Sequence, residues 1–472
     1  MKKQSQGEQL KAQLFKQKIN RWDTQAADLE TIFAFADDYK KALDYGKTER
    51  RFIDLAVQGL TAAGFQDISK FNRLKAGDKV FLTMHDKSLI AAVIGQKEPR
   101  EGWQIVGSHV DSPRLDLKPN PLMEDTELVY FKTHYYGGIK KYQWLSTALA
   151  IHGIVYLADG SKQEINIGES EDDPVFTITD LLPHLDKHLR DKKMTQFVDP
   201  EKMNLLIGSI PYPEKDLSDR FKLAILALLH DRYGIREVDF HRAEIEVVPA
   251  QKARDVGLDR SLIGAYGQDD RVCAYTSLRA LSEVENPERT AAILLVDKEE
   301  IGSDGNTGAQ SSAFQYKFNL LHEMILGREP GQAELAEFYL NSNLLSSDVC
   351  NAYDPSYAEV SDPLNSCYLN CGIGLNKYTG AGGKVSTNDS HAEFLAYVTG
   401  LFDQADVPYQ ICELGKVDWG GGGTIAKYFA KTGMNVIDSG VGVLAMHSCF
   451  EVTAKLDVYN AYRAYRTFLK EA

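Results

Sequence analysis

The sequence lacks the features of a protein that spans a membrane or binds nucleic acid. No apolar run approaches the roughly 18 residues that a membrane span needs, and the polar first residues contain no apolar signal segment. Positive charge is in deficit, with a net charge of −14 and a pI near 5.3. An acidic surface disfavours phosphate backbones and anionic lipids as partners. We therefore expect a cytoplasmic protein that uses neither nucleic acid nor membranes.

Cysteine is also scarce, and no C-x-x-C pair occurs. Six residues are scattered over the second half of the chain: Cys273, Cys350, Cys367, Cys371, Cys412 and Cys449. This spacing favours ordinary buried thiols in a reducing compartment over a disulfide framework or a thiolate metal site.

Two kinds of pattern share the 472 residues. Residues 1–112 and 256–472 alternate helical and strand patterns, whereas residues 113–255 are rich in strand patterns. The sequence thus predicts an α/β domain that is split by a β-rich insertion, since a chain of this length exceeds one ordinary core. Apolar residues at helical spacing predict one helix at 43–63 and another at 181–193.

A pair of adjacent glutamates follows an apolar segment. Residues 291–296 are typical of a strand that is buried on both faces, and Glu299 and Glu300 come shortly after it. Open α/β sheets bind ligands at the carboxyl ends of their strands. Adjacent glutamates are usually two solvated charges, but this position indicates a functional site.

Four further clusters of polar residues follow predicted strands or begin predicted helices. They contain His109 with Asp111, Asp269 with Asp270, Asp348, and His447 with Glu451. Each cluster alone is weak, because carboxylates also cap helices. Together they supply a mixed set of nitrogen and oxygen ligands that suits Zn²⁺, with Mn²⁺ and Co²⁺ as alternatives.

Such a set is typical of a dinuclear hydrolytic centre. Two metal ions roughly 3.5–4 Å apart, bridged by one carboxylate, would hold a hydroxide and polarise a carbonyl group. One glutamate of the adjacent pair would bind metal. Its neighbour, Glu299, would take the proton of the attacking water and pass it to a leaving amine.

Four segments, SHVDSPRLDLKPNP, GQDDR, DKEEIGS and MHSCFE, resemble the aspartyl aminopeptidase / aminopeptidase I family of dinuclear zinc peptidases in content and order. The resemblance spans nearly the whole chain. It implies a zinc-exopeptidase-like α/β domain (1–112 and 256–472) with a central mixed sheet flanked by helices, and an inserted dimerisation domain (113–255). It also implies a homo-oligomer that is built from dimers, with the family's tetrahedral dodecamer as one form.

The resemblance implies two metal ions per subunit. His109, Asp269 and Asp348 correspond to the ligands of one ion. Asp269 again, Glu300 and His447 correspond to the ligands of the other ion, so that Asp269 bridges the two.

The resemblance also implies roles around the metal ions. Glu299 corresponds to the general base, and Asp111 to the carboxylate that orients His109. A basic residue near the substrate side chain falls in the segment NKYTGAGGKVSTN, where Lys377 is the first candidate and Lys384 the second. A surface lysine on a glycine-rich loop is the alternative interpretation.

Within the insertion, the segment LLPHLDKHL resembles one whose histidine reaches a neighbouring subunit's active site. His188 is the first candidate and His184 the second, and a solvated histidine on a charged helix is the alternative. The residue after Asp269 varies within the family, so Asp270 receives no role. The glycine-rich segment KYTGAGGK departs from members that prefer acidic residues, which leaves an acidic or a broad neutral preference open.

These observations predict a metal-dependent aminopeptidase that acts on peptides with a free N-terminus. A related co-catalytic metallohydrolase, such as a deacylase, is one alternative, although SPRLDLKPNP favours the peptidase family. A catalytically silent scaffold is another. Loss of a ligand or of Glu299 would favour the scaffold, and none of these residues is missing.

Overall fold

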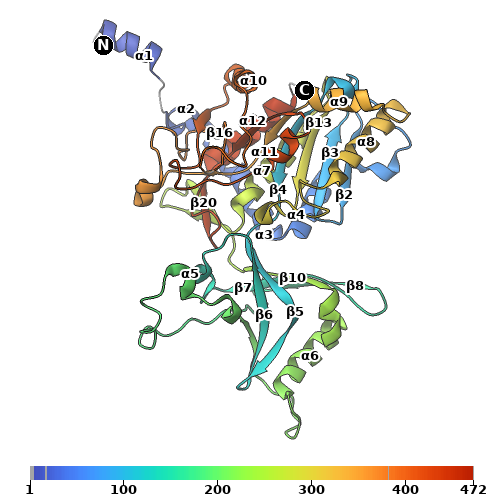
Figure 1. Cartoon of the computed structure of the whole chain (residues 1–472), viewed down its shortest axis with the longest axis vertical. Helices are drawn as coiled ribbons and strands as arrows, with labels where there is room; N and C mark the ends of the chain where they lie inside the picture. The colour runs from blue at the N-terminus through green and yellow to red at the C-terminus, as the bar shows by residue number, and fades with distance from the viewer. Residues whose placement is uncertain (1–4, 16–18, 381, 471–472) are drawn as a thin grey trace.

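The structure is a computed structural model that describes residues 5–15, 19–380 and 382–470. The described residues divide into a larger α/β part and a smaller β part, which lie one above the other in Figure 1. The larger part contains a nine-stranded and a five-stranded sheet, and the smaller part contains a six-stranded sheet. The predicted fold class, a central mixed α/β sheet with a separate β-rich region, is confirmed.

The nine-stranded sheet brings the ends of four parallel strands to one edge. Its strands are β1 (Gln66–Asp67), β2 (Lys79–Met84), β3 (Ser88–Val93), β4 (Gln104–His109), β13 (Ala291–Val296), β14 (Asn343–Ser346), β16 (Ile373–Asn376), β17 (Tyr409–Cys412) and β18 (Asn435–Gly440). Their order is β1-β2-β3-β13-β4-β14-β18-β16-β17. Strands β13, β4, β14 and β18 are parallel, and Val296 at the end of β13 lies beside His109 at the end of β4.

Helices cover both faces of this sheet. One face is covered by α3 (Leu29–Tyr45), α4 (Glu49–Ala62), α7 (Gln268–Ser282), α10 (Ala392–Gln404) and α12 (Lys455–Lys470), and the other by α8 (Ser312–Leu326), α9 (Gln332–Asn341) and α11 (Ala426–Ala430). Side chains of β13 alternate between the two cores, with Ile293 in one and Leu294 in the other. This alternation explains the continuous apolar run, because each face of the strand is buried. No helix among the described residues has the length and apolarity to cross a bilayer.

The predicted helix at 43–63 is wrong as a single element. Helix α3 ends at Tyr45, and α4 begins at Glu49 after the N-cap residue Thr48, whose side chain accepts a hydrogen bond from the Arg51 N–H. Between them, a Cβ atom on Gly46 would lie 2.8 Å from the Phe52 ring. A capping threonine and a tightly packed glycine therefore interrupt the apolar periodicity. Two shorter helices, α1 (Gln6–Leu14) and α2 (Trp22–Gln25), precede α3.

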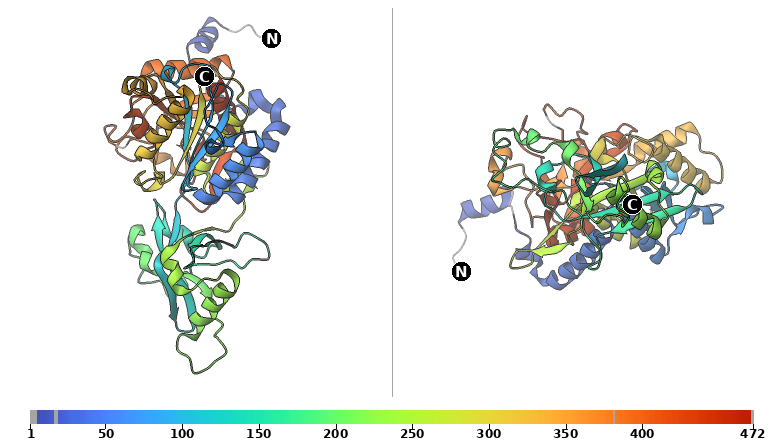
Figure 2. Two further views of the ribbon diagram at one scale, coloured as in Figure 1. Left: turned by 90° about the vertical axis from the view of Figure 1, so that its right-hand side faces the viewer. Right: turned by 90° about the horizontal axis from the view of Figure 1, so that it is seen from below.

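The smaller part is an antiparallel sheet with one long helix packed against it (Figure 2). Its strands are β5 (Arg114–Asp125), β6 (Leu128–Tyr136), β7 (Leu149–Tyr156), β8 (Lys162–Ile167), β9 (Leu205–Gly208) and β10 (Ala243–Pro249), in the order β8-β7-β10-β5-β6-β9. Its helices are α5 (Met194–Phe197) and α6 (Arg220–Tyr233). The core forms around Trp144, Phe131 and Phe240, separately from the cores of the large sheet.

The predicted helix at 181–193 is wrong. These residues form turns, and most of their side chains are exposed. A short helix is marginal unless an apolar face packs against a neighbour, and Leu181, Leu182 and Leu185 all remain exposed. Pro183 also interrupts the segment.

The five-stranded sheet closes the edge where the parallel strands end. It consists of β11 (Arg254–Val256), β12 (Leu262–Ala265), β15 (Cys350–Asn351), β19 (Gly442–Leu444) and β20 (Glu451–Ala454). Strand β12 leads into α7, and His447 lies in the turn between β19 and β20. The sheet thus brings residues from three distant parts of the sequence to the carboxyl edge of the large sheet.

Candidate metal centre

Five of the predicted residues converge at the carboxyl edge of the nine-stranded sheet. They are His109 at the end of β4, Asp269 in the first turn of α7, Glu300 in the 3₁₀ turn Glu299–Ile301 after β13, Asp348 after β14, and His447 after β19. Parallel strands that end together explain the position of three of them, and the five-stranded sheet explains the other two.

Asp269 lies between the two histidines. One of its carboxylate oxygens, Oδ1, is 3.1 Å from His109 Nε2, and the other, Oδ2, is 3.1 Å from His447 Nε2. His109 Nε2 is also 3.7 Å from Asp348 Oδ1, and His447 Nε2 is 3.5 Å from Glu300 Oε1. The two oxygens of Asp269 therefore face two different sets of donors, as a bridging carboxylate requires.

The electrostatics of the cluster fit a bound cation. Burial raises the pKa of Glu300 well above its usual value, and the charge of Asp269 raises it further. Burial also raises the pKa of Asp348. Glu300 Oε1 and Asp270 Oδ1 are buried and accept no hydrogen bond from the described residues. Because uncompensated buried carboxylates are unfavourable, divalent ions would stabilise this arrangement.

Asp270, which the sequence motifs left without a role, also belongs to the group of possible metal ligands. Donor atoms of His109, Asp270 and Asp348 lie within 4.8 Å of one another, as do those of His109, Asp269 and Glu300. Asp270 is fully buried, and its Oδ2 accepts a hydrogen bond from the backbone N–H of His109 at 3.3 Å. Sequence analysis gave it no role, although the adjacent aspartates were the available signal.

Asp111 connects His109 to the turn that contains Glu299 and Glu300. Its buried carboxylate accepts the backbone N–H of Glu299 on Oδ1 and that of Glu300 on Oδ2, both at 3.1 Å. Its Oδ1 also lies 3.3 Å from His109 Nδ1. One carboxylate therefore fixes both an imidazole ring and the two adjacent glutamates.

Two other residues support this centre, and sequence analysis gave neither of them a role. Tyr136, at the end of β6 in the smaller part, donates a hydrogen bond to Asp111 Oδ2 at 2.8 Å. Glu451 accepts the backbone N–H groups of Asp269 at 3.1 Å and of His447 at 2.7 Å. The motif MHSCFE contains Glu451, whereas no local pattern distinguishes Tyr136.

Glu299 has the properties of a group that can exchange protons near neutral pH. Its pKa is raised to about 8, chiefly by burial and also by the charges of Asp348 and Asp111, against the opposing effect of nearby His109. A carboxyl group that titrates near the working pH is well suited to general acid–base catalysis.

The candidates for substrate contact do not join this cluster. Lys377 directly follows β16 and is partly buried, whereas Lys384 is exposed. Lys384 Nζ lies 2.9 Å from Asp389 Oδ2 and 3.9 Å from the centre of the Tyr378 ring. His184 and His188 are exposed in the turns of 181–193.

Comparison with known proteins gives a match over most of the chain. Residues 43–469 match the family "Aminopeptidase I zinc metalloprotease (M18)". The "Probable M18 family aminopeptidase 1" of Borrelia garinii subsp. bavariensis is 47% identical over 442 residues, which cover 93% of this chain and 96% of that protein.

Solved structures agree with the sequence match. The crystal structure of the M18 aminopeptidase of Thermotoga maritima has a TM-score of 0.93 and 45% identity, covering 97% of this chain and 100% of that one. The structure of the S. cerevisiae mApe1 dodecamer has a TM-score of 0.74 and 21% identity, covering 92% and 96% of the two chains, and shows a shared fold. The chain therefore belongs to the M18 family of aminopeptidase I zinc metalloproteases and is a metallo-aminopeptidase.

Proposed function

We propose that the chain removes N-terminal residues from peptides with two divalent ions per subunit, zinc in the first instance. His109, Asp269 and Asp348 would hold one ion, and Asp269, Glu300 and His447 the other. The observation that carries this proposal is the position of Asp269, whose two oxygens each lie 3.1 Å from a different histidine.

The roles of the neighbouring residues follow from their contacts. Bound zinc would supply Lewis acidity for the peptide carbonyl and would lower the pKa of the attacking water. Glu299 takes a proton from this water and delivers it to the leaving amine. Asp111 holds the backbone of Glu299 and Glu300 and the His109 ring in place through its three contacts, so the position of Glu299 relative to His109 is fixed.

For the substrate side chain we propose an acidic or broad neutral preference, with Lys377 as the reader. The charge of Lys384 is already compensated by Asp389 at 2.9 Å. Among the described residues, no carboxylate forms an ion pair with Lys377. Lys377 therefore remains available for an acidic side chain.

We also propose that residues 113–255 form a dimerisation domain, and that dimers assemble further, with a dodecamer as one outcome. Large apolar side chains of this region, including Ile210, Leu228 and Leu185, are strongly exposed, and their burial against another subunit would be favourable. In this assembly His188 would reach a neighbouring subunit's active site. The dodecamer of the S. cerevisiae relative lends support, and light scattering of the purified chain would measure the assembly.

The function is tested by hydrolysis of unblocked aminoacyl amides with acidic, neutral and basic side chains. Activity should disappear with a chelator and return when zinc is added. Preference for acidic substrates would support Lys377 as the reader, whereas preference for Leu or Met would discard that role but keep the chemistry. Cleavage of N-acylated amino acids alone, with metal bound, would indicate the deacylase alternative, and no cleavage at all would indicate the scaffold.

A further inference from the structure

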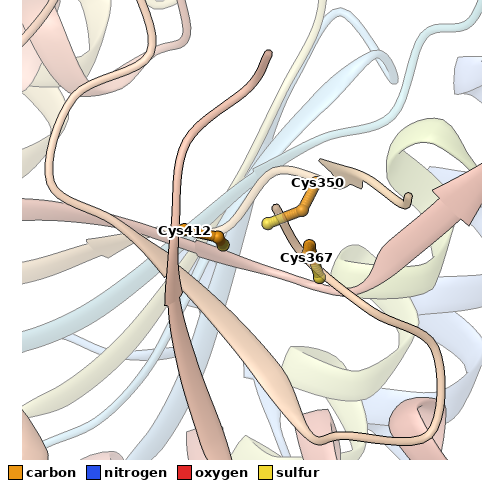
Figure 3. A group of neighbouring side chains, drawn as sticks. All are labelled: Cys350, Cys367 and Cys412. Atoms are coloured by element: carbon orange, nitrogen blue, oxygen red, sulfur yellow. The ribbon is translucent and has the colours of Figure 1, made fainter. Parts of the chain in front are cut away.

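Three cysteines that are far apart in the sequence meet in the fold. Cys350 begins β15, Cys412 ends β17, and Cys367 lies in the loop that connects β15 to β16. Figure 3 shows the three side chains gathered at one place, each on a different segment. Their sulfur atoms all lie within 4.8 Å of one another. Sequence spacing favoured scattered thiols, and the topology instead creates a cluster.

The cluster has the dimensions of a metal site. A metal–sulfur bond of about 2.3 Å places three trigonal sulfur atoms about 4 Å apart. The three sulfur atoms, all within 4.8 Å of one another, would thus need only small side-chain adjustments to hold one ion. A disulfide would need a sulfur–sulfur distance of about 2 Å, and none of the six cysteines, all of which lie among the described residues, forms one.

The surrounding backbone leaves space for the sulfur atoms. A Cβ atom on Gly374 would lie 2.5 Å from Cys350 Sγ and 3.0 Å from Cys412 Sγ. A Cβ atom on Gly442 would lie 3.1 Å from Cys367 Sγ. Any side chain at Gly374 would therefore collide with two of the three thiols.

Side-chain amide groups contact all three sulfur atoms. Asn376 donates a hydrogen bond from Nδ2 to Cys350 Sγ at 3.1 Å, and Gln410 donates one from Nε2 to Cys367 Sγ at 3.5 Å. The Cys412 thiol donates to Asn376 Oδ1 at 3.1 Å. Amide N–H donors such as those of Asn376 and Gln410 stabilise thiolates and orient metal ligands.

The cluster is sealed from solvent and separate from the aliphatic cores. Cys350, Cys367 and Cys412 are 2%, 0% and 2% exposed. They pack as a group of their own, apart from the two cores of the large sheet and the core of the smaller part. Besides one another, the sulfur atoms contact the side-chain amides of Asn376 and Gln410 and the backbone carbonyl groups of Leu375 and Gly440.

We propose that Cys350, Cys367 and Cys412 form a binding site for one soft, thiophilic cation, in addition to the centre at Asp269. Thiolate ligands select ions such as Zn²⁺, Cd²⁺ and Cu⁺ over harder ions. A divalent ion that displaces two thiol protons leaves the centre neutral, with the third sulfur as a neutral ligand. The ion ties β15, which begins two residues after Asp348, to β17 and to the loop of Cys367.

The test uses Cd²⁺ as the probe on the full-length protein under reducing conditions. Cadmium bound to thiolates gives an ultraviolet sulfur-to-metal charge-transfer band, which carboxylate and imidazole ligands do not produce. The band should appear with one cadmium ion per subunit beyond those at the Asp269 centre, counted by native mass spectrometry. Since burial slows entry, the protein is also prepared from medium that contains cadmium.

Variants separate the cluster from the other thiols. Cys412→Ala and Cys367→Ala should each lose most of the band, whereas Cys371→Ala, a buried cysteine of the same region outside the cluster, should keep it. The proposal is overturned if the unmodified protein gives no band after either preparation, or if Cys371→Ala alone loses it. A mass lower by the hydrogens of a disulfide, mapped to two of the three cysteines, would show a redox pair instead. None of these readouts depends on peptidase activity.

Discussion

The carboxyl edge of the large sheet and the loops around it differ in how firmly they hold their candidate residues. At the edge, the polar atoms of neighbouring side chains lie 3.1–3.7 Å apart, among His109, Asp269, Glu300, Asp348 and His447. On the loops, the candidates for substrate contact lie partly or fully exposed. The first group is held in place within one chain by the register of the strands and by burial. The second group lies on turns and loops with few buried side chains, so neighbouring elements of the same chain fix its position less firmly.

The largest effect should come from the paired glutamates. Replacing the base by Glu299→Gln should lower kcat by about 10²–10⁴-fold while bound zinc stays constant, because a lost general base affects the proton transfer alone. Glu300→Gln should instead lower the zinc content, which elemental analysis measures. Glu337→Gln, an exposed position on α9, serves as the control. Loss of zinc in Glu299→Gln with zinc retained in Glu300→Gln would mean that the two roles are exchanged.

In protein without bound zinc, the free energy of unfolding should decrease as the pH rises from 5 to 8. Without metal, burial raises the pKa of Glu299 to about 8 and that of Glu300 well above its usual range. Burial lowers the pKa of His447, but its contact with Asp269 more than offsets this and raises it to about 11. The folded state thus binds more protons than the unfolded state between pH 5 and 8. Unfolding releases these protons, so the free energy of unfolding decreases as the pH rises.

This change is measured from melting temperatures of chelated and zinc-loaded protein at several pH values. Each additional proton held by the folded state contributes about 1.4 kcal/mol per pH unit. Asp269, whose pKa is lowered chiefly by the two histidines against the effect of burial, would oppose the trend only in strong acid. Parallel curves for the two forms would contradict the idea that the metal ions compensate this charge.

A smaller effect should follow from the hydrogen bond that crosses between the two parts of the molecule. Tyr136→Phe removes the donor to Asp111 Oδ2, and loss of such an outer contact typically lowers activity or metal affinity by about 10–100-fold. We expect kcat to fall more than KM changes, with the fold unaltered by circular dichroism. Tyr130→Phe on the same strand is the control, and equal kinetics in both variants would limit Tyr136 to a packing role.

The smallest effects are expected on the loops. Lys377→Ala should lower kcat/KM for acidic aminoacyl amides by several-fold and leave neutral substrates unchanged, since a partly exposed ion pair contributes about 1 kcal/mol or less. Lys384→Ala, whose charge is already paired with Asp389, is the matched comparison. If only Lys384→Ala changed the preference, the loop of Lys384 would carry the recognition.

Sequence reasoning succeeded where burial leaves a periodic signal. The run at 291–296 predicted β13 because both faces of that strand are buried, and the glutamate pair follows it. It failed at 181–193, where most leucines of an apparently helical pattern stay exposed instead of packing against other described residues. It also could not anticipate that Cys350, Cys367 and Cys412 meet, because sheet topology determines which distant strands are neighbours. Tyr136 was missed for the same reason.

The contact of Tyr136 with Asp111 also bears on attempts to shorten this enzyme. A minimal version that replaces residues 113–255 by a short linker would keep every candidate metal ligand and the proposed base, Glu299. It would nevertheless lose one of the groups that hold Asp111, together with the Arg114 guanidinium that stacks 4.0 Å above the Tyr136 ring. A shortened chain would therefore need a new hydrogen-bond donor for the Asp111 carboxylate, which also holds the turn of Glu299 and Glu300.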